Sequence, residues 1–177
     1  MTGSRGDMAV RAAMLSVLGF ALGAALSTPA LAQSVTQIGT FKDWSAYSAS
    51  EGAGAMCFAM SKPSTVDPQP DGYTQAYLYL THRPAENISN ELNLVAGFEF
   101  APDQPATLTV DGKDFDLFTQ KDAAWLLDEK QADDLAGAIR AGNSLSIQGT
   151  TNKGILVTET FSLSGATAAS KAIDAGC

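Results

Sequence analysis

The chain has 177 residues, of which 45% are hydrophobic, and it carries a formal net charge of −8 at pH 7. This acidic balance disfavours nucleic acids and anionic lipid heads as partners, because both carry negative phosphates. One histidine and two cysteines are too few for the usual sets of zinc ligands, so we expect neither a metal ion nor another cofactor.

Residues 1–32 have the features of a cleavable export signal. Two arginines precede an apolar stretch at residues 12–26, which is shorter than the roughly 20 residues that a membrane-spanning helix needs. Ala30 and Ala32 form the small-x-small pattern that signal peptidase accepts. Cleavage after Ala32 would leave residues 33–177 as one domain without a later transmembrane segment. We therefore expect a periplasmic, secreted or surface-associated protein.

The two cysteines, Cys57 and Cys177, are expected to form a structural disulfide, because a pair of cysteines in an exported chain usually bonds. Closing this loop of about 120 residues would restrict the unfolded chain by about 4–5 kcal/mol. Neither cysteine belongs to a Cys-x-x-Cys pair, which disfavours a redox-active site.

Short apolar runs alternate with turn residues along the mature chain, a pattern typical of an antiparallel β-sandwich. We expect the first two strands at residues 43–48 and 55–62. An irregular loop should follow at residues 63–72, which hold three prolines. Residues 76–82 form the clearest strand, and residues 91–96 form the next.

The alternation at residues 76–82 places His82 on one face of its strand and Tyr77 and Tyr79 on the other. Both faces are largely apolar, so we expect a central strand that is covered on both sides. For the two tyrosines, a core position is preferred over a recognition patch. A core position is also expected for the remaining prominent aromatic residues: Phe41, Trp44, Phe58, Phe115, Phe118 and Trp125.

The Asp-Gly pair at residues 111–112 predicts a type I′ hairpin between strands at residues 106–110 and 113–119, because both turn positions need a positive φ. Three aspartates crowd this hairpin, and we interpret them as solvated residues and not as calcium ligands. A further hairpin is expected from residues 144–150 and 155–162.

Residues 128–141 predict a helix with Asp128 as its N-cap and Gly142 as its stop. A short final helix is expected at residues 166–175. The predicted fold class is mostly β: an antiparallel β-sandwich with one helix near residues 128–141 and a short C-terminal helix.

Several segments of the mature chain together resemble one family of exported bacterial proteins. They are CFAMSKP at 57–63, THRPAEN at 81–87, NE at 90–91, AGF at 96–98, VDGKDFDLF at 110–118, AW at 124–125, FSLSG at 161–165 and AIDAGC at 172–177. Read in order, they are similar to the invasion associated locus B family over about residues 40–177. The Thr-His-Arg-Pro segment and the terminal Ala-Ile-Asp-x-x-Cys are the most specific of them.

The resemblance implies an exported, β-rich envelope protein linked in pathogens to host-cell invasion, and it supplies no catalytic residue. The chain departs from the family pattern in two places. An Arg-Gly pair of the last hairpin turn is Lys153-Gly154 here, and an early cysteine of some members is absent after Trp44. If that turn binds an anion, Lys153 would do so without the bidentate fork of arginine.

His82 is the only histidine, so a nucleophilic site of the Ser-His-Asp type would have to use it. The sequence contains neither a Gly-x-Ser-x-Gly elbow nor a Ser-x-x-Lys motif. We expect His82 and Arg83 to bond structurally to the backbone or to nearby carboxylates such as Glu86 or Glu91. This interpretation is favoured over a functional site because structural ion pairs often mimic functional ones.

The sequence therefore favours a non-catalytic binding or accessory module of the cell envelope or host interface. Its partner would be a protein or an envelope component, and its candidate binding residues are His82, Arg83, Tyr77, Tyr79 and Lys153. The alternative is a hydrolase that uses paired carboxylates or a site at His82 and Arg83. A third possibility is a purely structural envelope protein without a specific partner.

Overall fold

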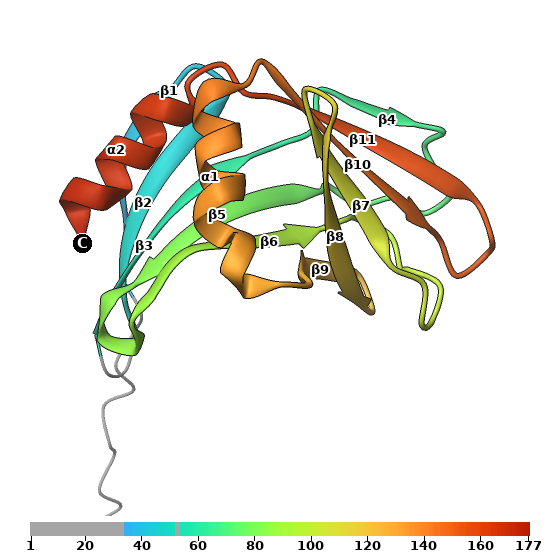
Figure 1. The fold of residues 1–177 in the computed structure, drawn as a ribbon, viewed down its shortest axis with the longest axis horizontal. Coiled ribbons are helices and arrows are strands. Elements are labelled where there is room, and N and C mark those ends of the chain that lie inside the picture. Colours follow the sequence, from blue (N-terminus) through green and yellow to red (C-terminus); the bar gives the residue numbers. More distant parts are fainter. Residues whose placement is uncertain (1–33, 52–53) are drawn as a thin grey trace, which may run out of the picture. The chain divides into compact units, whose positions relative to one another are not determined.

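The computed structural model describes residues 34–51 and 54–177, so the expected export signal lies outside the described residues (Figure 1). Within these ranges the chain forms eleven strands and two α-helices. The strands are β1 (Val35–Phe41), β2 (Trp44–Glu51), β3 (Gly54–Ser61), β4 (Thr65–Asp67), β5 (Tyr77–Arg83), β6 (Ile88–Val95), β7 (Ala106–Val110), β8 (Lys113–Gln120), β9 (Ala123–Leu126), β10 (Ser144–Thr150) and β11 (Leu156–Ser162). The helices are α1 (Ala132–Ala141) and α2 (Ala166–Gly176), and short 3-10 turns, η1 (Pro84–Glu86) and η2 (Glu129–Gln131), precede β6 and α1.

All described strands belong to one antiparallel sheet with the order β1-β2-β3-β5-β6-β9-β8-β7-β10-β11-β4. The strand at its far edge, β4, follows β3 after only three residues, so the sheet bends back toward its own first half. Two hydrogen bonds join the start of β2 and the β3–β4 connection to β11. The indole N–H of Trp44 donates to the carbonyl of Ser162 at 2.9 Å, and the Ser64 N–H donates to the carbonyl of Thr160 at 2.7 Å.

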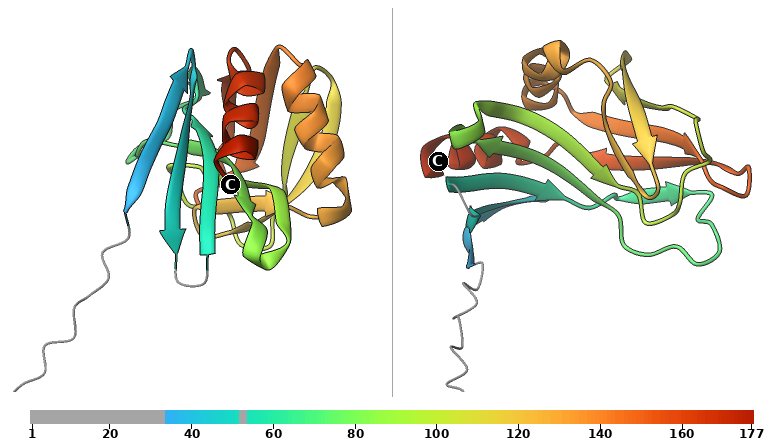
Figure 2. Two further views of the ribbon diagram at one scale, coloured as in Figure 1. Left: turned by 90° about the vertical axis from the view of Figure 1, so that its left-hand side faces the viewer. Right: turned by 90° about the horizontal axis from the view of Figure 1, so that it is seen from below.

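Both helices pack on the same side of the sheet, in front of β2, β3, β5 and β6 in the view of Figure 1. Figure 2 shows them side by side, with α2 against β1, β2 and β3 and α1 over β6. Their buried residues, among them Leu135, Ile139 and Ile173, join the strand residues Leu80 and Leu94 in one apolar core. The helices therefore fill the inner side of the curved sheet.

The predicted type I′ hairpin is present, with φ of 45° at Asp111 and 89° at Gly112. The Asp111 carboxylate also accepts the backbone N–H groups of Asn143 and Ser144 at 3.0 and 3.2 Å. These hydrogen bonds, that from Asn143 first, lower the pKa of Asp111 below its ordinary value. Asp111 therefore makes the turn and also fixes the start of β10.

The mostly β antiparallel class with two helices is confirmed, whereas the two-layer sandwich is not directly confirmed because the described strands form one ladder. Three strands were not predicted: β1, β4 and β9. The predicted helix at 128–141 is a 3-10 turn, capped by Asp128, followed by α1. Helix α1 ends at Gly142, as expected, and the backbone of Gly142 itself is extended. Glycine is required there by space, since an added Cβ would lie 2.8 Å from Val110 Cγ1.

Across the described part of the chain, neither helix has the length and apolar character needed to cross a membrane.

Candidate functional site

Aromatic and methionine side chains gather on the outer side of the sheet, which faces away from the helices. In β5 the alternation is clear: Leu78 and Leu80 are fully buried inside, while Tyr77 and Tyr79 are half-buried outside. We call this surface the aromatic face. Its members are Tyr47, Met56, Phe58, Met60, Tyr77, Tyr79, Phe118 and Trp125.

The pairing register aligns this face into a row across five neighbouring strands. In order from β3 to β8, the row consists of Met60, Tyr79, Asn93, Trp125 and Phe118. Because neighbouring strands lie about 4.8 Å apart, the row extends over about 19 Å. Residues that are far apart in sequence thereby form one continuous surface.

The rings of the aromatic face contact one another directly. Tyr47 stacks on Phe58 with centroids 5.1 Å apart, and Phe58 meets Tyr79 edge-to-face at 5.9 Å. At the other end of the face, Phe118 stacks on Trp125 at 5.3 Å. Such pairs hold the rings in defined orientations, so the surface is pre-arranged for contact.

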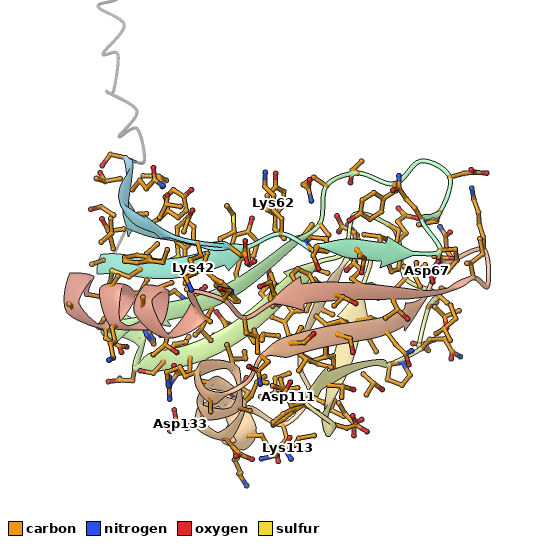
Figure 3. All side chains as sticks on the ribbon, turned by 90° about the horizontal axis from the view of Figure 1, so that it is seen from above. Lys42, Lys62, Asp67, Asp111, Lys113 and Asp133 are labelled. Atoms are coloured by element: carbon orange, nitrogen blue, oxygen red, sulfur yellow. A yellow bond between two sulfur atoms is a disulfide. The ribbon has the colours of Figure 1, made fainter. Side chains whose placement is uncertain are left out.

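Lys62 borders this surface. Its ammonium lies 5.5 Å above the centroid of the Tyr77 ring, within the range of a cation–π contact. In Figure 3, Lys62 lies on the opposite side of the molecule from Asp111 and Lys113, whose hairpin is remote from this end of the face.

Two grooves adjoin the aromatic face and share Glu91 and Trp125. The first has a volume of about 450 Å³ and opens where β6 separates from β8, β9 and η2. Its lining residues include Ser89, Leu92, Phe118, Gln120, Leu126 and Glu129. The second has a volume of about 300 Å³ and is lined by Met56, Phe58, Tyr79, Thr81, Arg83 and Asn93.

Arg83 supplies the positive charge at the second groove. Its terminal nitrogen lies 2.6 Å from a carboxylate oxygen of Glu91, and its Nε lies 3.4 Å from Glu86. Glu86 and Glu91, the carboxylates expected from the sequence, are therefore the observed partners of Arg83. The Glu91 pair is only about one-third exposed on either side, so it also fixes the orientation of the guanidinium at the groove.

His82 lies on the inner side of the sheet, away from these grooves, and is only 7% exposed. Its Nδ1 accepts the backbone N–H of Asn90 at 3.1 Å. The proton of a neutral ring is therefore on Nε2, which lies 2.9 Å from an oxygen of Asp174. This contact does not meet hydrogen-bond geometry, so Nε2 has no hydrogen-bond partner among the described residues and its contact with Asp174 is electrostatic. His82 thus links β5, β6 and α2.

Asn90 extends this link to α1. Its φ is 57°, at a place where the β5–β6 register shifts, and its side-chain amide donates to Asp133 at 2.7 Å. The chain Asp174–His82–Asn90–Asp133 therefore joins both helices to the strands. These contacts give His82 a structural role in joining the helices to the sheet.

The structure places Cys57 and Cys177 at disulfide distance, with sulfurs 2.10 Å apart and Cα atoms 5.8 Å apart. Cys57 is fully buried and is the cross-strand neighbour of His82. The bond therefore fastens the end of α2 to the inner face of β3, beside the His82–Asp174 contact.

A buried carboxyl that the sequence did not single out lies in β11. Glu159 is 1% exposed, and burial raises its pKa to about 8. The Tyr73 hydroxyl donates to Oε1 of Glu159 at 3.3 Å and accepts the Ala76 N–H, while Oε2 has no partner among the described residues. Burial and the nearby Glu159 raise the pKa of Tyr73 to about 12. None of the grooves described above reaches this pair.

Lys153 lies in the turn between β10 and β11, outside both grooves. Its backbone N–H donates to the hydroxyl of Thr151 at 3.3 Å. Of the candidate binding residues, the structure therefore brings together Tyr77, Tyr79 and Arg83, but neither His82 nor Lys153.

The expectation of a core position was correct for Trp44 and Phe115, which are 1% and 2% exposed, and Phe41 packs against the core. It was wrong for Tyr79, Phe58 and Trp125, which line the outer grooves. It was also wrong for Tyr77, which is half-buried on the same outer face, and for Phe118, which is 44% exposed. A usable signal existed in β3. Cys57 must face inward to reach α2, so its neighbour Phe58 must face outward.

The model of the family described as invasion associated locus B (IalB) protein matches residues 44–174. The chain belongs to this family. The matched region runs from β2 to the last turn of α2 and so includes the aromatic face and both grooves.

Among solved structures, the chain is similar to invasion associated protein B from Bartonella henselae, with a TM-score of 0.57 and 17% sequence identity. The match covers 79% of this chain and 96% of that one. At this identity the likeness concerns the fold alone. None of the curated proteins matches the chain.

Proposed function

We propose that this IalB family member is an exported, non-catalytic module of the cell envelope that binds a protein partner through the aromatic face. The observation that carries the proposal is the row across five strands, in which four positions hold ring or methionine side chains and the β6 position holds Asn93, on the side of the sheet that the helices leave uncovered. In the core of a binding surface, tyrosine, tryptophan, phenylalanine, methionine and arginine are the enriched residue types.

The shape of the surface supports the same proposal. Two grooves flank Trp125, and tryptophan, tyrosine and arginine are the residues that most often dominate binding energy when they sit beside such pockets. The ring contacts already hold Phe58 and Tyr79 in place, so little side-chain freedom remains to be lost on binding.

Export to an oxidising compartment is supported by two further features. The first is the signal-like sequence at residues 1–32. The second is the disulfide-distance pair Cys57–Cys177, because such bonds persist in the periplasm and outside the cell and are rare in the cytosol. A periplasmic or surface location follows as part of the proposal.

The hydrolase alternative at His82 and Arg83 has weaker support. The two residues are consecutive in a strand, so their side chains point to opposite faces of the sheet and do not form one site. His82 Nδ1 is also occupied by a backbone N–H. A pair of carboxylates does line the first groove, Glu91 and Glu129, but Glu91 is held by Arg83. The family is not a known enzyme family.

A matched pull-down tests the proposal. Tagged mature protein and a Phe58→Ser, Tyr79→Ser variant are compared in envelope extracts, with a Lys171→Ser variant of the exposed side of α2 as control. We expect the wild type and the control to retain one partner that the double variant loses, with purified-partner affinity reduced at least about 30-fold. Equal retention by all three proteins would contradict a role for the aromatic face.

A further inference from the structure

The first groove combines a stacked aromatic wall with an excess of negative charge. Phe118 and Trp125 form the wall, and Glu91 and Glu129 supply carboxylates to the same lining. Arg83, which lines the adjoining second groove, already contacts both Glu86 and Glu91. The Glu91 carboxylate is therefore already paired, whereas Glu129 has no ion-pair partner among residues 34–51 and 54–177.

This combination selects for a particular side chain in a partner. Aromatic faces attract cations, and arginine is preferred because its flat guanidinium stacks on a ring while it donates two hydrogen bonds to a carboxylate. An acidic or neutral side chain would leave Glu129 without compensation. The flanking apolar residues Leu92, Leu126 and Ala132 would contact the aliphatic neighbours of that arginine.

We propose that the groove between β6, β9 and η2 binds an arginine side chain on an extended, partly apolar segment of the protein partner. The inference rests on the proposed function and narrows it to the chemistry of the partner. The charge of the whole chain favours the same kind of partner, because its 19 acidic residues outnumber its 11 basic ones and attract positively charged segments at a distance.

The protein contains its own reporter and control for this site. It has only two tryptophans. Trp125 lines the groove, whereas Trp44 is 1% exposed and its indole N–H is bonded to Ser162 inside the fold. In a nitrogen-15-labelled sample, a ligand in the groove should shift the indole signal of Trp125 and leave that of Trp44 in place.

The probe is the peptide acetyl-Leu-Arg-Leu-Arg-Leu-amide, titrated into the labelled mature protein with the disulfide intact. Its matched control carries citrulline, the neutral isostere of arginine, in both arginine positions. We expect saturable shifts at Trp125 with the arginine peptide, and binding weaker by roughly tenfold with the citrulline peptide. Glu129→Gln should reduce affinity similarly, whereas Asp71→Asn, an exposed carboxylate on a distant loop, should leave it unchanged.

Three results would overturn the inference: no shift at Trp125, equal binding of both peptides, or equal effects of Glu129→Gln and Asp71→Asn. Equal shifts with phosphatidylcholine vesicles would assign the groove to the cationic headgroup of a lipid. Shifts that depend on protein concentration alone would assign the groove to a second copy of the chain. Each of these two results would also overturn the inference. If the pull-down partner is still lost in the Phe58, Tyr79 double variant, only the arginine inference fails and the proposed function stands.

Discussion

Replacing the buried carboxyl of Glu159 by an amide should stabilise the protein at neutral and alkaline pH. Glu159→Gln keeps an acceptor for the Tyr73 hydroxyl and cannot ionise. In the folded protein, burial raises the pKa of Glu159 from 4.5 to about 8. The fold thus favours the neutral acid, whereas the unfolded chain ionises near the ordinary pKa.

The sign and size of the effect follow from that difference. Below about pH 4.5 the acid is neutral in both states and contributes no penalty. As the pH rises from 4.5 to about 8, the wild type loses about 1.4 kcal/mol of unfolding free energy per pH unit relative to the amide variant. At pH 7 the accumulated difference is about 3 kcal/mol, and above pH 8 it levels off.

Urea unfolding of the wild type and Glu159→Gln at several values between pH 4.5 and 8.5 measures this difference directly. Other titrating groups cancel between the two proteins, and Tyr73, with a pKa of about 12, does not ionise in the window. We expect the two midpoints to approach each other near pH 4.5 and to separate steadily above it. Midpoints that stay parallel across the whole range would refute the reasoning.

Four further variants test the contacts around the helices. His82→Ala should lower the unfolding free energy by about 2 kcal/mol in thermal or urea melts, because it truncates a buried side chain and leaves the part-buried backbone N–H of Asn90 without its acceptor; an unchanged stability would contradict the structural role. Replacing Cys57 and Cys177 by serine should cost about 4–5 kcal/mol relative to the oxidised protein, since the bond closes a separation of 120 residues; a loss below about 1 kcal/mol would argue against the bond. Gly165→Ala should strongly destabilise the fold, because its φ is 97° and the added Cβ would lie 1.8 Å from the Phe41 carbonyl oxygen. Gly137→Ala, in open space on α1, should instead stabilise the protein by about 0.5–1 kcal/mol. Equal effects of the two substitutions on stability would contradict the geometry.

Local signals predicted the elements whose structure is decided locally. The Asp111-Gly112 turn specifies a positive φ at two consecutive positions, so its hairpin was predictable without the rest of the chain. The strands that were missed depend on distant partners instead. The three residues of β4 are ordered by β11, and β1 is a largely exposed edge strand that pairs with β2.

The candidate site was only partly predictable for a related reason. Periodicity correctly placed Tyr77 and Tyr79 on the face opposite His82, but periodicity alone does not say which face meets the helices. The grouping of Trp125 with Tyr79 requires the sheet order, in which β9 lies beside β6. The aromatic character of these residues then favoured a core position in the prediction, since aromatic side chains are more often buried than exposed.

Site-specific photo-crosslinking tests the central claim, binding of a protein through the aromatic face, most directly. A photoreactive phenylalanine derivative replaces Tyr79, or, as control, the exposed Lys171 of α2, and the exported protein is irradiated in intact cells. We expect a discrete protein adduct from position 79 and none from position 171. Adducts of equal yield from both positions, or from position 171 alone, would contradict it.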